Sequence, residues 1–192
     1  MAAQSISLDD FTIRNTKAEE VDEFIQILEE AAEWLQENNI RQWPLGMFRN
    51  SRSDILAAID ARQCYMIDYR SSSSSVAGLF VINYDDPFDE TLWEGFVEDW
   101  KDALYLHRLV IKAPYQGLGL TPKIFAFAED KVKEAGRHYL RLDCLADNKV
   151  LRKFYGSRCR GKDKGGLKEL TTVWNPELGL KFARFEHQVA PL

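Results

Sequence analysis

The chain has 192 residues, of which 45% are hydrophobic and 29% are charged, and its formal net charge is −5 at pH 7. This length suits one ordinary domain with a real core, and this composition excludes a wholly disordered chain. No apolar run approaches the roughly 20 residues that a membrane helix needs, and the first residues lack the pattern of a secretory signal. The sequence pI of about 5.3 argues against a nucleic-acid-binding protein.

The cysteines indicate a reducing compartment. Cys64, Cys144 and Cys159 are odd in number, scattered along the chain and without CxxC spacing. They predict reduced thiols in a cytoplasmic protein, and neither a zinc site nor a disulfide framework.

In chain order, the first half predicts a short strand at 11–14, a helix over 18–37 and a second helix from Ser51 or Ser53 to about Ala61. Thr16 and Glu19 form the pattern of a capping box before the first helix. Residues 38–48 predict a loop. Residues 64–69 and 76–83 are rich in strand formers, and the serine run between them predicts a hairpin loop and no domain boundary.

The second half begins with residues 104–111, LYLHRLVI, which predict a buried strand. A turn at 113–119 leads into a helix over 121–135 that Gly136 ends. A strand at 138–145, a short helix at 148–155 and a closing antiparallel pair at 168–174 and 181–187 follow. This order predicts a single α/β domain over residues 1–192, with a mixed, mostly antiparallel sheet of about six or seven strands and about four helices.

Charge is unevenly distributed along the chain. Residues 85–102 hold eight acidic side chains and one basic, and residues 149–168 hold eight basic and one acidic. One interpretation is a polarised molecule, with an anionic cofactor at one pole and a cationic substrate at the other. The alternative is two solvated loops.

Residues 112–122, KAPYQGLGLTP, form the most informative stretch, because they join a strand to a helix through a turn that carries Gly117 and Gly119. Such a turn presents backbone N–H groups at a helix N-terminus, where a pyrophosphate can bind. The stretch is neither a Walker loop nor a dinucleotide fingerprint, because it lacks GK[ST] and a third glycine.

Several motifs follow one another along the second half of the chain: the strand HRLVI, the turn Gln116-Gly117-Leu118-Gly119-Leu120-Thr121, the strand LRLDC, then Asn148 and the helix LRKFY that ends in Tyr155. In their type and spacing they resemble the motifs of the GCN5-related N-acetyltransferases (GNAT). The resemblance covers about residues 104–157, the expected cofactor-binding core. Thr121 replaces the usual Gly or Ala, Pro122 removes one amide, and the Gly-Phe that follows the tyrosine helix in the family is absent.

The resemblance implies acetyl-coenzyme A as co-substrate. The main chain around Leu109, Val110 and Ile111 would pair with the pantetheine arm, and amides of the turn would hold the pyrophosphate. The residues implied for cofactor binding are Leu109, Val110, Ile111, Gln116, Gly117, Leu118, Gly119, Leu120, Thr121, Asn148, Arg152 and Tyr155. Lys112, Lys123 and Arg152 supply local positive potential in this interpretation, or are plain surface cations.

The expected reaction is direct attack of a primary amine on the thioester. The resemblance places Tyr155 beside the sulfur as the general acid, and a phenol donates a proton without carrying charge. His107 is the preferred base, since an ordinary histidine is mostly neutral at pH 7 and strand alternation points it the same way as Leu109. The fallback is an acidic residue of the 85–102 segment: Glu94, Glu98 or Asp99.

The expected acceptor is a small, cationic amine, with no nucleic acid and no membrane as partner. Two alternatives stay open: a protein or peptide N-acetyltransferase, and a non-catalytic domain that senses acetyl-coenzyme A. The oligomeric state also stays open, although members of the family often form homodimers.

Overall fold

The computed structural model describes residues 6–70, 75–85 and 87–190, and these fall into two compact units. The first unit comprises the described residues up to Val81 together with Arg108–Leu120. The second comprises Ile82–His107 and the described residues from Thr121 onwards.

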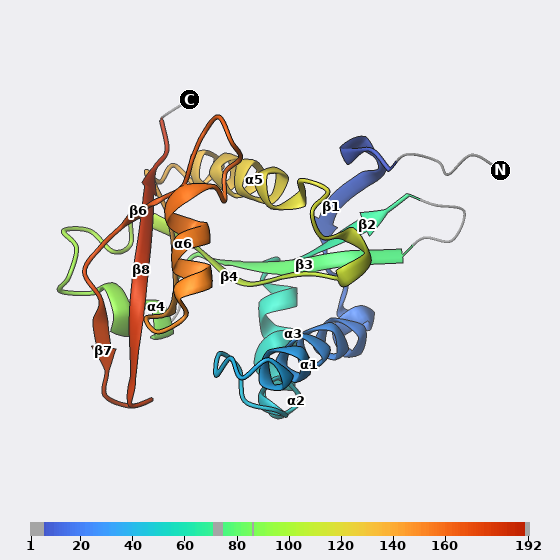
Figure 1. Ribbon diagram of the computed structural model, residues 1–192, viewed down its shortest axis with the longest axis horizontal. Coiled ribbons are helices and arrows are strands. Elements are labelled where there is room, and N and C mark those ends of the chain that lie inside the picture. Colours follow the sequence, from blue (N-terminus) through green and yellow to red (C-terminus); the bar gives the residue numbers. More distant parts are fainter. Residues whose placement is uncertain (1–5, 71–74, 86, 191–192) are drawn as a thin grey trace. The chain divides into compact units, whose positions relative to one another are not determined.

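Eight strands are present in the described residues, and their hydrogen-bonded order is β1-β2-β3-β4-β5-β8-β6, with β7 also paired to β8 (Figure 1). The pairs β1–β2, β2–β3, β5–β8, β6–β8 and β7–β8 are antiparallel, whereas β4–β5 is parallel. The mixed, mostly antiparallel sheet is therefore as predicted. The strand bounds are β1 (Phe11–Asn15), β2 (Cys64–Tyr69), β3 (Ser75–Asn83), β4 (Ala103–Ile111), β5 (Tyr139–Leu145), β6 (Lys168–Glu169), β7 (Val173–Asn175) and β8 (Leu180–Gln188).

The strand count exceeds the expected six or seven because the segment 168–174 breaks into two short strands, each paired with β8. The antiparallel pairing of β2 with β3 confirms the predicted hairpin, although Ser71–Ser74 lie outside the described residues. The described part of the chain also has six α-helices, where about four were expected. They are α1 (Val21–Glu37), α2 (Met47–Asn50), α3 (Arg52–Asp60), α4 (Pro87–Trp93), α5 (Leu120–Glu134) and α6 (Lys149–Ser157).

In the first unit, helices α1 and α3 build a core with strands β2 and β3. The buried face of α1 repeats every three or four residues, as the sequence predicted, with Phe24 and Leu28 fully buried against Ile55 and Met66. Burial of each such side chain contributes about 1.5–3 kcal/mol.

The predicted capping box at Thr16 and Glu19 is wrong by one residue. The chain enters α1 through a 3₁₀ turn at Ala18–Glu20, and the backbone N–H of Lys17 donates to Glu20. The Thr16 hydroxyl is buried and finds no hydrogen-bond partner among the described residues. Glu20 is fixed instead by Arg14, whose guanidinium also binds Asp68 at 2.5 Å.

Helix α2, which the sequence did not predict, depends on a buried carboxylate. Glu29 of α1 is 3% exposed and accepts the backbone N–H groups of Gly46, Phe48 and Arg49 at 2.9–3.0 Å. These are N–H groups at the start of a helix, which have no intrahelical partner. The loop after α1 is thereby held against the helix that precedes it.

Strand β4 is irregular near its end. Arg108 has a φ of 53°, a left-handed conformation that is uncommon for a residue with a side chain. The sequence predicted that the side chains of His107 and Leu109 point to the same side of the strand. The left-handed residue between them breaks that alternation. Gly78 of β3 lies so close to the Val110 carbonyl oxygen that a Cβ there would sit 2.4 Å from it, so only glycine fits this position.

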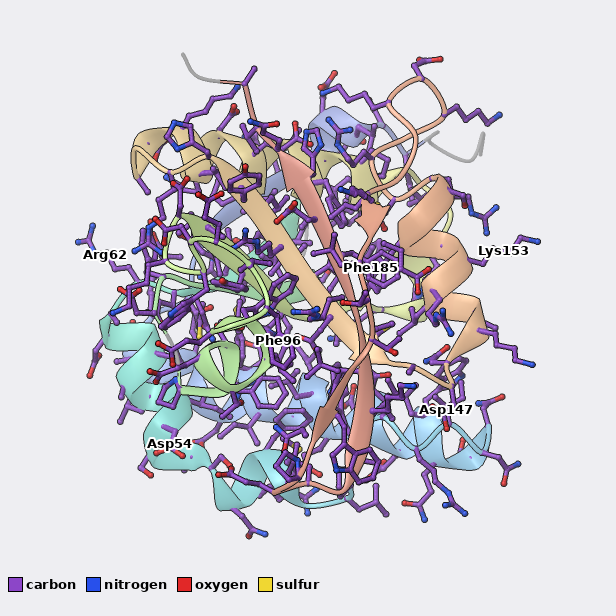
Figure 2. The ribbon with its side chains drawn as sticks, turned by 90° about the vertical axis from the view of Figure 1, so that its left-hand side faces the viewer. Asp54, Arg62, Phe96, Asp147, Lys153 and Phe185 are labelled. Atoms are coloured by element: carbon purple, nitrogen blue, oxygen red, sulfur yellow. The ribbon has the colours of Figure 1, made fainter. Side chains whose placement is uncertain are left out.

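In the second unit, α6 lies beside β8. The Tyr155 ring packs on Phe185 of β8 with ring centroids 5.6 Å apart. Figure 2 shows Phe185 close to α6, while Lys153 projects from the helix away from the strands. The helix thus has one apolar side against the sheet and one cationic side.

A second core in this unit surrounds Trp93 of α4. Its members include Leu92, Tyr105, Val173 and Phe182. No helix in the described parts of the chain has the length and apolar character needed to cross a membrane.

The Glu29 cap gives a stability prediction. Burial raises the pKa of Glu29, but the three backbone N–H donors outweigh it, so the pKa is lowered overall. Its contribution is therefore present above pH ~4.3 and lost as pH falls through the lower folded pKa. We expect Glu29→Gln to cost about 2 kcal/mol in urea unfolding at pH 7, and less at pH 3.

The exposed Glu33 on the same helix provides the control. Glu33→Gln should leave the free energy of unfolding within about 0.5 kcal/mol of the parent. Equal effects of the two substitutions would contradict the role assigned to Glu29.

Candidate active site

The turn between β4 and α5 has the features expected of an anion-binding loop. Gly117 and Gly119 have φ of 78° and 84°, and a Cβ added at Gly117 would meet nothing within 4 Å. The Gln116 side chain donates to the Ile111 carbonyl oxygen at 3.0 Å and so ties the two ends of the turn together. Helix α5 begins at Leu120, so the amides near Leu118–Thr121 lie at the N-terminus of a 15-residue helix.

Pro122 occupies the first turn of α5, where it costs no intrahelical hydrogen bond. It does remove one amide from the set that a phosphate can use. The other cofactor-binding candidates before the turn, Leu109, Val110 and Ile111, are half-buried at the end of β4. The turn and the start of α5 therefore fit a phosphate-bearing ligand.

His107 lies between two carboxylates in the second unit. Its Nε2 is 2.7 Å from Oδ1 of Asp89 on α4, and its Nδ1 is 3.8 Å from Oδ2 of Asp143 on β5. The side chains of His107, Asp89 and Asp143 are 15%, 0% and 7% exposed. Phe88 packs edge-on against the imidazole, with ring centroids 6.2 Å apart.

The register of the sheet explains the pairing of His107 with Asp143. Strand β4 pairs in parallel with β5 from Ala103 opposite Tyr139 to Tyr105 opposite Arg141. Two residues further along each strand, with side chains on the same face, come His107 and Asp143. Their approach thus follows from strand geometry, whereas Asp89 arrives from a separate helix.

Burial changes the chemistry of Asp143. Desolvation raises the pKa of its carboxyl to about 6, helped by the charge of Asp89 and opposed by His107. Its Oδ2 is buried and has no hydrogen-bond partner in the described chain. Asp143 is therefore largely ionised at neutral pH, but at an energetic cost.

Tyr155, the candidate acid, belongs to the same unit. Burial, followed by nearby Cys144, Cys159 and Asp143, raises the pKa of its phenol above the usual range. The negative charge of Asp143, which faces His107, is thus one of the causes that raise the pKa of Tyr155. The phenol consequently keeps its proton throughout the physiological pH range.

Asn148 and Arg152, the remaining cofactor candidates, both have structural roles around α6. Asn148 caps the helix, accepting the Leu151 N–H at 3.1 Å. The Arg152 guanidinium binds Glu169 at 2.7 Å and the Ala146 carbonyl oxygen at 2.9 Å. The charge of Arg152 is therefore paired, and Lys149 and Lys153 are the exposed cations of this helix.

The structure brings together His107 and two acidic residues that the sequence analysis did not select. Asp89 was one of eight acidic residues in its segment, and nothing in its spacing distinguished it. Asp143 lies as far from the start of β5 as His107 lies from the start of β4, but the sequence alone predicted no register between these two strands. The fallback bases Glu94, Glu98 and Asp99 are all exposed.

Asp89, His107 and Asp143 also have the residue types of a metal site, with ligand atoms within 4.8 Å of one another. A tetrahedral zinc ion with bonds of about 2.0 Å would hold two ligand atoms about 3.3 Å apart. The 2.7 Å separation of His107 Nε2 from Asp89 Oδ1 suits a hydrogen bond and is too short for two ligands of one ion.

The comparisons with known proteins agree on one family. The acetyltransferase (GNAT) family model matches residues 28–161. A protein of Bacillus subtilis (strain 168), described as the uncharacterized N-acetyltransferase YesJ, is 26% identical over 160 residues, which are 80% of this chain and 87% of that protein.

Solved structures share the fold. An acetyltransferase of the GNAT family from Listeria monocytogenes 4b F2365 superposes with a TM-score of 0.71 at 22% identity, over 93% of this chain and 94% of that one. RimL, a ribosomal L7/L12 α-N-protein acetyltransferase in complex with coenzyme A, superposes with a TM-score of 0.63 at 13% identity, over 94% of each chain.

The burial of Asp143 gives a testable prediction. Its folded pKa is raised, so ionisation opposes folding, and this penalty builds from pH ~4 to its full value above pH ~6. We expect Asp143→Asn to stabilise the protein at pH 7.5 by about 2 kcal/mol. The gain should disappear near pH 4, and chemical unfolding at the two pH values measures it.

A loss of stability at pH 7.5 equal to that at pH 4 would show that Asp143 is not held in a costly ionised state.

Proposed function

The chain belongs to the acetyltransferase (GNAT) family and is an acetyl-coenzyme A-dependent N-acetyltransferase, and we propose that it acetylates a primary amine of a small, cationic acceptor. The observation that supports this acceptor class is the pair of buried carboxylates around His107. Carboxylates attract an ammonium group and disfavour an anionic acceptor.

The proposed cofactor contacts follow the motifs. The main chain around Leu109–Ile111 pairs with the pantetheine arm, and the amides of Leu118–Thr121 bind the pyrophosphate. The two glycines in left-handed conformation and the start of α5 support this assignment. In this proposal Gln116 shapes the turn, and Asn148 and Arg152 act mainly by fixing the start of α6.

The acceptor amine must lose a proton before it can attack the thioester. An aliphatic amine with a pKa near 10 is neutral in only about one molecule in a thousand at pH 7, equivalent to roughly 4 kcal/mol. His107 accepts that proton, and the free amine attacks the thioester carbon. Tyr155 donates its phenolic proton to the departing thiolate, a role that its raised pKa supports by keeping it protonated.

Direct attack is favoured over an acetyl-cysteine intermediate. Burial raises the pKa of Cys64, Cys144 and Cys159 to about 12, so the reactive thiolate is scarce. All three thiols are buried. The acetyl group therefore passes from sulfur to nitrogen in one transfer.

A thiol-release assay with acetyl-coenzyme A and a panel of polyamines, aminoglycosides, amino compounds and peptides tests the proposed acceptor class. Release with cationic small amines, and little with peptides, is the expected pattern. Selective release with peptides would favour a protein acceptor, the kind of acceptor on which RimL acts. No release with any acceptor, together with tight acetyl-coenzyme A binding, would indicate a sensor domain.

Substitutions test the two catalytic assignments. With the best acceptor of the panel, we expect His107→Ala and Tyr155→Phe each to lower kcat by about 10²–10⁴-fold, the usual range for a lost general acid or base. Thermal unfolding serves as the control for folding. Wild-type rates in both variants would reject both assignments.

A matched substitution tests the direct route. Of the two cysteines that act on the pKa of Tyr155, Cys144 has the larger effect, and it is the one to substitute. We expect Cys144→Ser to retain kcat within about threefold, and mass spectrometry to find no acetylated enzyme after rapid quenching. A stable acetyl adduct on Cys144 would overturn the direct mechanism.

A further inference from the structure

Asp89 and His107 form a hydrogen bond of 2.7 Å whose donor depends on the tautomer of His107. If Asp89 is ionised it can only accept, and the Nε2–H of His107 is then the donor to Asp89 Oδ1. In the neutral ring the other nitrogen, Nδ1, is then the acceptor. Nδ1 is the nitrogen that faces Asp143.

The distance between His107 Nδ1 and Asp143 Oδ2 excludes a direct hydrogen bond between them. At 3.8 Å the two atoms are too far apart for a hydrogen bond. Both are acceptors, and a cationic nitrogen about 2.8 Å from each can bridge them. Asp143 Oδ2 lacks a hydrogen-bond partner in the described residues, and its side chain is 93% buried. An ammonium group beside Asp143 Oδ2 would give this oxygen a hydrogen-bond donor and a charged partner.

Resting on the proposed function, we propose that Asp143 and His107 together form the subsite for the acceptor ammonium, and that Asp89 is a positioning residue that sets the tautomer of His107. Asp143 holds the R–NH₃⁺ group by an ion pair, and His107 Nδ1 takes one of its protons. The neutral nitrogen then forms the C–N bond while the C–S bond breaks.

The protons balance in this scheme. His107 leaves the step as an imidazolium whose Nε2–H donates to Asp89, and it returns the proton on Nδ1 to solvent. Tyr155 protonates the thiolate, and the phenolate then takes the second proton that the acylated nitrogen loses. The net reaction converts R–NH₃⁺ and acetyl-coenzyme A into the amide, free coenzyme A and one released proton. The subsite excludes carboxylate-bearing amines whose anionic group would lie next to Asp143.

Steady-state kinetics with acetyl-coenzyme A and cadaverine, a small cationic diamine, test the proposal. We expect Asp143→Asn to raise KM for cadaverine by about tenfold or more with kcat changed less than threefold, because it removes the ion pair. We expect Asp89→Asn to lower kcat by about tenfold or more with KM little changed, because the amide no longer fixes the tautomer. Glu90→Gln, an exposed neighbour of Asp89 on α4, should match the parent.

Nitrogen-15 NMR of histidine-labelled protein gives a readout that a purely structural role would not change. The chain has three histidines, and the His107 signals, assigned by their loss in His107→Ala, should report the Nε2–H tautomer in the parent and a mixture in Asp89→Asn. We expect Asp143→Asn to be at least as stable as the parent at pH 7.5, so it carries the test even where Asp89→Asn lowers the melting temperature.

The outcomes separate the subsite from the proposed function. Parent activity on cadaverine with both Asn variants unchanged would overturn the subsite and leave the acetyltransferase assignment to small amines in place. No parent activity on cadaverine or on any other cationic amine of the panel would overturn both. Loss of parent activity on addition of EDTA, restored by zinc, would show that the three residues bind a metal ion and would also overturn the subsite.

Discussion

Two buried arginines determine the arrangement of the second unit. Arg141 and Arg184 are 2% and 1% exposed, and both guanidinium groups lie about the ring of Trp93 at 5.1–5.2 Å. A buried guanidinium needs partners for its donors, because an unsatisfied charge in the interior costs several kcal/mol. Arg184 donates to the Leu92 carbonyl oxygen, and Arg141 donates to those of Asp99 and Trp100.

The same bonds help to place Asp89 in the candidate site. The carbonyl groups that satisfy the arginines belong to α4 and to the segment that follows it, so this part of the chain is fixed to β5 and β8. Asp89 lies one turn before Leu92 and is held against His107 as a result. The acidic segment is therefore partly an internal element: Asp102 accepts the backbone N–H of His138, and Asp85 pairs with Arg137. Neither of the two interpretations of this segment from sequence included that role.

The sequence alone predicted those elements whose local residue pattern agrees with their burial in the fold. The apolar run of β4, the glycine turn and the periodic α5 were predictable because each is encoded within about 15 residues. Helices α2 and α4 were not, because each is short and depends on a distant partner: α2 on Glu29, and α4 on Arg184. The same limit applies to the site. His107 could be selected because it lies in a strand that the sequence predicts. Asp89 could not, because it reaches His107 only through tertiary packing, which residue spacing does not reveal.

The regions that depart from local preference are those on which the proposed chemistry depends. Asp143 keeps an ionised carboxylate in a buried position, and Arg108, next to His107 in the chain, keeps a left-handed backbone that costs about 1–2 kcal/mol. Neither feature contributes to folding, so both need compensation from the rest of the molecule. The Trp93 core and the α1 core supply it through apolar burial. A buried carboxylate gains from a cationic ligand, because binding supplies a charged partner in place of the water that folding removed. On this argument the cost of burying Asp143 in the free protein becomes part of its affinity for an ammonium group.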